Sequence, residues 1–223
     1  MRDKYIKPLA IIVVALSLLC SCKKETPVLE DGKAKVRFVN AYLNADPQEF
    51  YQDNSKLTNH AIAYGAFSDY FDVNAGRSTF WSNNIVENKA TSAIEGVLYG
   101  ENVYTLFYYE NKDSKPAMVG YINQKNTPAI GKFKVRFVNL AVMFNDKPLV
   151  IKNVNSLLLD GLGFGVTPTY FELSVGAELR INVKDQAIAT AIPPASFQDG
   201  KTYLIWFDTV DGITVDYHIV PQD

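Results

Sequence analysis

The hexapeptide KVRFVN at residues 35–40 occurs a second time, letter for letter, at residues 134–139. The shift between the two copies is 99 residues, and the correspondence continues with one extra residue, so that Gly76 matches Gly176. Repeats in solenoid proteins are far shorter than this. The repeated hexapeptide therefore predicts two consecutive copies of one domain.

Each copy alternates apolar and polar residues with a period of two. Val36 and Phe38 alternate with charged residues in the first hexapeptide, and residues 179–183 (LRINV) show the same pattern in the second copy. Such alternation predicts strands with one buried face. Residues 103–109 (VYTLFYY) and 203–207 (YLIWF) are apolar on both faces, which is typical of strands in the middle of a sheet. No window of a dozen residues shows helical periodicity, so we expect an all-β fold with two tandem antiparallel β-sandwiches of immunoglobulin-like size.

A turn signal stands between the last two expected strands. Asp211-Gly212 separates residues 203–210 from residues 213–220. An Asp-Gly pair between strand runs is typical of a type I′ hairpin turn, in which both central residues have positive φ. We therefore expect a tight two-residue hairpin at this position.

The N-terminus has the pattern of a cleaved targeting segment. Basic residues Arg2, Lys4 and Lys7 precede the apolar run LAIIVVALSLL at residues 9–19. A helix over that run would be about 16 Å long, roughly half the ~30 Å needed to cross a bilayer core. The pattern predicts a signal peptide rather than a membrane-spanning helix.

The chain has two cysteines, Cys20 and Cys22. They cannot complete a tetrahedral zinc site with histidines as remote as His60 and His218, and a disulfide between residues two apart would be strained. The stretch LCSC at residues 19–22 resembles a bacterial lipobox. That resemblance implies that the signal is cut before Cys22 and that the Cys22 thiol carries the acyl chains of a membrane anchor. The alternative is an ordinary cleaved signal with two incidental cysteines.

These patterns divide the chain into five parts. They are the signal peptide (1–21), the lipidated cysteine and spacer (22–33), the first β-sandwich repeat (34–122), a linker (123–131) and the second β-sandwich repeat (132–223). Removal of residues 1–21 takes away three basic residues and one acidic residue, so 19 Lys plus Arg remain against 23 Asp plus Glu, a net charge of −4. A chain of that balance lacks the basic surface that nucleic-acid partners require.

Longer stretches of both copies resemble a known family. These stretches are KVRFVNAYLNADPQEFYQD and AIAYGAFSDYFDVNAGRSTF in the first copy, and GLGFGVTPTYFELSVGAELRINV and DGKTYLIWF in the second. They are similar to the domain-of-unknown-function family numbered 4397, common in secreted and lipid-anchored bacterial proteins. The Cys-Lys-Lys that ends the signal resembles lipoproteins of the Bacteroidota. The resemblance implies an envelope protein, lipid-anchored at the outer membrane on its surface or its periplasmic face, and implies no chemistry.

Few residues are candidates for catalysis or metal binding. His60 and His218 lack a nucleophile motif such as G-x-S-x-G beside them. The carboxylate pairs Asp69 with Asp72 and Glu49 with Asp53 do not recur between the copies, and Asp208, Asp211 and Asp216 lack the spacing of a calcium-binding loop. We therefore expect no catalytic residue, no cofactor and no metal. Asn40 and Asn139, which end the repeated hexapeptides, are expected to bond backbone groups of the turns that follow.

Aromatic residues are the remaining candidates for binding. The chain has 13 Tyr, 13 Phe and two Trp. Flat rings on a β-sandwich can cover the C–H face of a sugar, but rings that alternate into a core serve packing. Trp206 lies in a strand that is apolar on both faces and is expected in the core, whereas Trp81, next to Ser82, is the candidate for exposure.

Three function classes follow in order of preference. The first is a non-catalytic envelope lipoprotein that binds a glycan or a protein. The second is a structural or assembly lipoprotein that partners an outer-membrane complex, and the third is a carboxylate-based hydrolase. An exposed Trp or Tyr cluster in both copies would favour glycan binding, and a continuous apolar patch would favour a protein partner.

Overall fold

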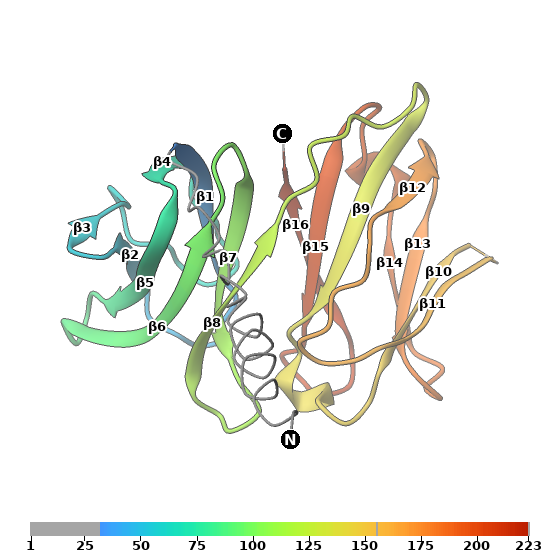
Figure 1. Ribbon diagram of the computed structural model, residues 1–223. Helices are drawn as coiled ribbons and strands as arrows, with labels where there is room; N and C mark the ends of the chain where they lie inside the picture. The colour runs from blue at the N-terminus through green and yellow to red at the C-terminus, as the bar shows by residue number, and fades with distance from the viewer. Residues whose placement is uncertain (1–31, 155, 223) are drawn as a thin grey trace, which may run out of the picture.

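The structure, a computed structural model, describes residues 32–154 and 156–222 (Figure 1). These residues form sixteen strands and two short 3₁₀-helices. The expected signal peptide and the expected lipid attachment at Cys22 lie outside the described residues. Among the residues it does describe, there is no helix with the length and apolar character needed to cross a membrane.

The first sandwich consists of two four-stranded sheets. The inner sheet has the order β4-β1-β7-β8 and the outer sheet the order β3-β2-β5-β6. The strands are β1 (Lys33–Asn40), β2 (Gln48–Gln52), β3 (Ser55–Lys56), β4 (Phe71–Asn74), β5 (Gly76–Asn84), β6 (Lys89–Leu98), β7 (Val103–Glu110) and β8 (Pro116–Ile122).

The second sandwich repeats this arrangement strand for strand. Its inner sheet has the order β12-β9-β15-β16 and its outer sheet β11-β10-β13-β14. The elements are β9 (Lys132–Asn139), η1 (Val142–Phe144), β10 (Leu149–Asn153), β11 (Ser156–Leu162), β12 (Phe171–Ser174), β13 (Leu179–Val183), β14 (Ala189–Ile192), η2 (Pro194–Ser196), β15 (Thr202–Asp208) and β16 (Asp216–Pro221). Register is preserved as well: Lys35 lies opposite Val103 in the first sandwich, and Lys134 lies opposite Thr202 in the second.

The expectation of two all-β sandwiches is confirmed, but the sheets are not wholly antiparallel. In each inner sheet one central pair is parallel, β1 with β7 and β9 with β15. Parallel neighbours need a long connection, and here almost the whole sandwich lies between the two strands. The repeated hexapeptide thus forms a central strand whose neighbours are distant in the sequence.

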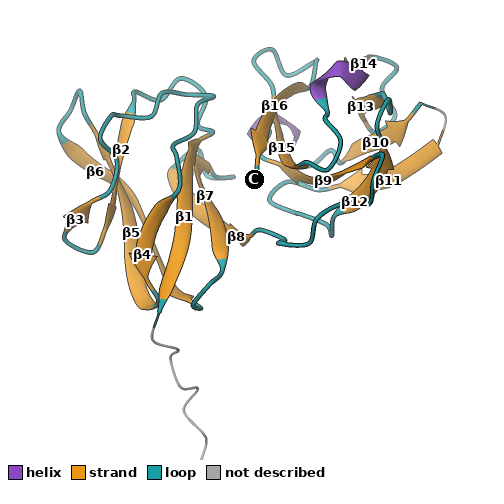
Figure 2. Cartoon of the chain, turned by 90° about the horizontal axis from the view of Figure 1, so that it is seen from above, coloured by secondary structure: helices purple, strands orange, loops and turns teal. Residues whose placement is uncertain are grey.

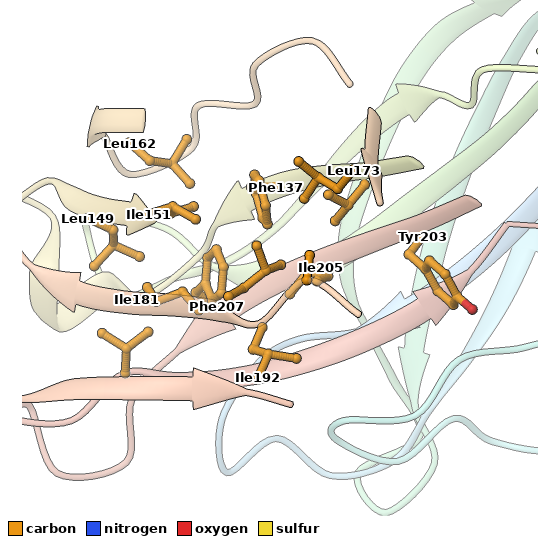
Figure 3. Packing of buried hydrophobic residues seen from close by; sticks show 14 of the residues in the cluster. Phe137, Leu149, Ile151, Leu162, Leu173, Ile181, Ile192, Tyr203, Ile205 and Phe207 are labelled. Atoms are coloured by element: carbon orange, nitrogen blue, oxygen red, sulfur yellow. The ribbon is translucent and has the colours of Figure 1, made fainter. Parts of the chain in front are cut away.

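Each sandwich has its own apolar core between its sheets. In the first core, Phe38 stacks on Phe50 with ring centroids 4.4 Å apart. In the second core, Phe137, Ile151 and Phe207 are fully buried and converge from three strands (Figure 3). Inward residues of period-two strands therefore form the cores, as the alternation predicts.

A third apolar cluster joins the two sandwiches. The inner sheets pack against each other, so the molecule has four sheet layers (Figures 1 and 2). This cluster, called the central core below, consists of Val39, Ala41, Phe107, Tyr121, Val138, Leu140, Leu204, Trp206 and Val220. The expectation that the hexapeptide strand is half-buried holds only at its start, where Lys35 is exposed. From Val36 to Asn40 every residue is buried, because the central core covers the second face of the strand.

The expected type I′ hairpin at Asp211-Gly212 is also wrong. The last two strands are joined by residues 209–215, and only Gly212 of the pair has positive φ, at 68°. The Asp211 carboxylate organises this loop instead, since it accepts hydrogen bonds from the backbone N–H of Ile213 and Thr214, each at 2.8 Å. The two strands are thus joined by a seven-residue loop that the Asp211 side chain stabilises, and not by a two-residue turn.

Candidate functional site

Two aromatic side chains stack on the outward face of the first sandwich's outer sheet. In β2 and β5 the inward positions are taken by Phe50 and Phe80, so the alternate positions Tyr51 and Trp81 point away from the core. Tyr51 and Trp81 are register partners, and their rings stack with centroids 4.0 Å apart and an interplanar angle of 10°. Both are only partly buried. We call this pair the aromatic platform.

Hydrogen bonds hold the platform in place. The Trp81 Nε1–H donates to the carbonyl oxygen of Asp53 at 2.7 Å, and the Tyr51 hydroxyl donates to Glu49 Oε2 at 3.0 Å. Lys56 pairs with the other oxygen of Glu49 at 2.5 Å, and this bond lowers the pKa of the Glu49 carboxyl. Because these polar atoms are already engaged, the two rings present mainly carbon surface to solvent.

One side of the indole faces small and polar residues. Trp81 lies opposite Ala93 of β6, whose methyl side chain is exposed. The adjacent outward positions are Thr79, Asn83 and Glu95. A ring beside a small residue, with hydroxyl, amide and carboxylate groups around it, can stack on an apolar face of a ligand and bond its polar rim.

The second sandwich has different chemistry at the same place. The register pair that corresponds to Tyr51 and Trp81 is Lys152 and Arg180, both exposed. Arg180 Nε donates to Glu178 Oε1 at 2.7 Å. The aromatic platform therefore occurs in the first sandwich and not at the equivalent register pair of the second.

A pocket lies at the end of the first sandwich where β1 and β7 finish, called the distal end below. Its volume is about 440 Å³, within the range of small-ligand sites. The lining residues are Tyr42, Leu43, Asn44, Ala45, Asp46, Gln48, Asn84, Glu87, Thr91, Tyr108, Glu110 and Pro116. The Asn84 amide donates to Asp46 Oδ2 at 2.9 Å, and burial together with Glu110 raises the pKa of Tyr42. Acceptors and hydroxyl groups dominate this pocket, so it suits a hydroxyl-rich ligand better than an anion.

Neither histidine belongs to the aromatic platform or lines the pocket. His60 is exposed in a loop, whereas His218 stacks on Trp206 with centroids 3.8 Å apart and lies 3.2 Å from Asp208 Oδ1. Trp206 is fully buried, as expected, but in the central core rather than within one sandwich. No group of His, Cys, Asp and Glu side chains with the arrangement of a metal site occurs among the described residues.

Asn40 and Asn139 do bond the backbone, as expected. The Asn40 amide donates to the carbonyl of Ile62, and the Asn139 amide donates to the carbonyl of Leu162, both at 3.0 Å. Both side chains are fully buried. These equivalent bonds fix the loops that follow the two hexapeptide strands.

Sequence reasoning missed Tyr51 as the partner of Trp81. Period-two alternation in QEFYQ does place Tyr51 outward, since Phe50 is inward. The pairing of the two rings, however, depends on which strands are neighbours, and the alternation carries no information about that.

Comparisons with known proteins locate the chain among proteins of known sequence and structure. Residues 34–151 match the family DUF4397, described as "Domain of unknown function". No curated protein matches the chain.

Two solved structures from bacteria match the chain weakly. One is described as "Alpha-glucan binding by a streptococcal virulence factor", with 14% identity, a TM-score of 0.25 and coverage of 83% of this chain and 96% of that one. Another, from Parabacteroides distasonis, is described as a candidate cell adhesion protein, with 7% identity, a TM-score of 0.23 and coverage of 87% and 100%. At identities and TM-scores this low, the likeness does not extend to a ligand.

Proposed function

The chain belongs to the DUF4397 family of domains of unknown function, and from that premise we propose that it is a non-catalytic binding module that recognises a glycan. The observation that carries this proposal is the aromatic platform, in which Trp81 is stacked, anchored and partly exposed beside Ala93. A flat ring with polar neighbours suits the alternating C–H and hydroxyl surface of a sugar.

The proposal includes an envelope location. The basic start, the short apolar run and the lipobox-like LCSC at residues 19–22 support a lipid on Cys22 and attachment to the outer membrane of a member of the Bacteroidota. The tether would then enter the fold at the start of β1, so the distal end would point away from the membrane. We further propose that each sandwich is one copy of the family domain, which the common strand order supports.

A binding assay with the soluble fragment of residues 23–223 tests the proposal. Calorimetric titration with bacterial and dietary polysaccharides should find a ligand that is not turned over. Trp81→Ala should lower its affinity at least tenfold, because loss of an anchoring ring costs roughly 2 kcal/mol or more. Tyr99→Ala, which removes an exposed ring away from the platform, is the matched control and should leave affinity unchanged.

The same assay distinguishes the platform from the distal pocket. Loss of binding in Tyr42→Ala but not in Trp81→Ala would place the ligand in the pocket. Hydrolysis of any polysaccharide by the fragment would contradict the non-catalytic proposal and restore the carboxylate hydrolase as the alternative.

An assembly role with a protein partner is the second candidate. Large apolar side chains are exposed on the loops at the distal end of the second sandwich, where Met143 is 53% and Val210 64% exposed. Protease treatment of intact cells separates the two proposals. Digestion in unbroken cells supports capture of an external glycan, whereas protection until lysis supports assembly with a periplasmic partner.

A further inference from the structure

The contacts between the two sandwiches occur in pairs related by the same shift as the sequence repeat. The Arg37 guanidinium donates to the carbonyl of Pro221, and the Arg136 guanidinium donates to the carbonyl of Ile122 at 2.9 Å. Both the donors and the acceptors differ by 99 residues. Each inner sheet therefore has an arginine at the equivalent position, and this arginine bonds the end of the last strand of the other inner sheet.

Each arginine lies over the ring of an equivalent tyrosine, Tyr70 or Tyr170. The Arg37 guanidinium lies 4.0 Å from the ring centre of Tyr70, and that of Arg136 lies 5.4 Å from the ring centre of Tyr170. The Tyr70 hydroxyl donates to the carbonyl of Gln222 across the interface, and the Tyr170 hydroxyl accepts from the backbone N–H of Gln124 at 3.2 Å. The cation–π contact thus recurs on both sides of the interface, and each tyrosine hydroxyl also forms a hydrogen bond with the backbone of the other sandwich or of the linker.

The centre of the interface is made by equivalent residues that touch each other. Phe107 of β7 and Trp206 of β15 occupy matching positions, and their rings meet edge to face at 6.4 Å. Contact between a residue and its own equivalent occurs where a twofold axis passes through an interface. The two sandwiches are related by such an axis within a single chain.

We propose that the face made by β1, β7 and β8 is a pairing surface whose partner is a second sandwich of the same fold, whether or not the two are covalently joined. The linker at residues 123–131 then keeps the two sandwiches in one chain, but the contacts between their surfaces are sufficient for them to associate. The partner is recognised by the fully buried apolar centre and by the two arginines at the rim.

The two sandwiches differ at one contact. This difference predicts which sandwich binds a copy of itself more tightly. At the distal end, the Tyr64 hydroxyl of the first sandwich donates to the buried Asp208 carboxylate of the second. The equivalent contact on the other side joins Phe164 and Tyr109 through their rings, 6.2 Å apart. A pair of first halves would juxtapose only tyrosines there. A pair of second halves would bury Asp208 against phenylalanine, where it would keep His218 as a partner but lose its tyrosine donor.

Cleavage of the folded chain tests the pairing surface. A protease site replaces the exposed residues 124–127, and the full protein is cut after folding. The two halves should elute together from a sizing column at the mass of the intact chain. When the cut halves are separated by affinity tags without denaturant, the first half should form a homodimer and the second half should remain a monomer.

Paired variants show whether the surface itself holds the halves together. Arg37→Ala combined with Arg136→Ala should weaken association of the cut halves by at least about tenfold, because hydrogen bonds from charged donors are lost on both sides. Lys152→Ala combined with Arg180→Ala removes two exposed cations from the outer sheet and should leave association unchanged. Separation of the halves on cleavage, as folded or aggregated species, would overturn the proposal, as would equal effects of the two double variants.

Discussion

At the residue scale, a few polar side chains hold the loops of this all-β chain. Asn40 and Asn139 occupy equivalent buried positions, and each bonds one backbone carbonyl and one backbone N–H of the loops around it. A buried amide that satisfies two backbone groups is costly to replace, since each group would otherwise be left unpaired. The recurrence of Asn at both hexapeptide ends thus has a structural explanation.

Gly212 gives a prediction of stability. Its φ of 68° lies in the left-handed region, and a Cβ there would stand 3.4 Å from the Met143 sulfur. Gly212→Val should lower the free energy of unfolding by about 1–3 kcal/mol, because a β-branched residue is strained at positive φ. Chemical denaturation measures the change, and an unchanged midpoint would mean that the loop does not require this conformation.

Asp211 gives a prediction of pH dependence. Hydrogen bonds from Thr214, by its side chain and backbone, and from Ile213 hold the pKa of the Asp211 carboxyl well below its usual range. A lowered pKa in the folded state stabilises the fold above the unfolded pKa of about 3.9, and this contribution is lost as the pH falls further. Asp211→Asn should therefore be less stable than the wild type at pH 7.

The comparison with pH checks the sign of this effect. Thermal melts of wild type and Asp211→Asn should converge as the pH is lowered from 5 toward 2, since the unfolded chain then takes up a proton that the folded carboxyl, with its lowered pKa, does not bind. Asp211→Ala, which removes the acceptors altogether, should remain the least stable of the three. A stability gap that widens on acidification would contradict the assignment.

At the element scale, the inner-sheet strands are buried on two faces. In β7, Leu106 and Tyr108 pack inside the first sandwich while Phe107 packs in the central core. Strands buried on both faces lose the polar alternation of surface strands. This explains why residues 103–109 and 203–207 are apolar throughout.

Substitution of Phe107 tests how much burial of the second face of β7 contributes to stability. The residue is 0% exposed although it points out of its own sandwich. Phe107→Ala should cost about 3–5 kcal/mol, the usual range for a core phenylalanine. Tyr99→Ala at an exposed position should stay within about 0.5 kcal/mol, and a similarly small effect of Phe107→Ala would mean that the central core contributes little.

At the scale of the whole molecule, the four-layer arrangement separates two outer faces. The outer sheets lie on opposite sides of the paired inner sheets (Figure 2). The aromatic platform is on the outward face of one of them and the Lys152–Arg180 pair is on the other. The inner surfaces of the two sandwiches therefore carry similar residues, whereas their outer surfaces carry different ones.

The proposed lipid attachment at Cys22 gives a prediction at this scale. Cys22→Ser should abolish incorporation of labelled fatty acid and release the protein from the membrane fraction, because the lipobox-like pattern places acylation there. Cys20→Ser should leave both properties intact. Loss of the lipid in Cys20→Ser instead would move the cleavage site.

Much of the fold could be predicted from local patterns. The repeated hexapeptide and the alternation of residues such as Leu179, Ile181 and Val183 identify strands and a duplication, because side chains of a strand alternate between two faces. The parallel pairing of β1 with β7, the wide loop around Asp211 and the partner of Trp81 could not be predicted in this way. Each depends on which distant segments become neighbours.

The sequence by itself determined that the chain is an all-β protein with an internal repeat and a start that resembles a lipoprotein signal, since period, repeat and composition are local properties. Only the tertiary structure decided that the inner sheets pair across a central core, that Trp206 belongs to it, and that Tyr51 stacks on Trp81. The reason is physical. An apolar residue records that a surface is buried, but what buries it is set by contacts between strands that are remote in the chain.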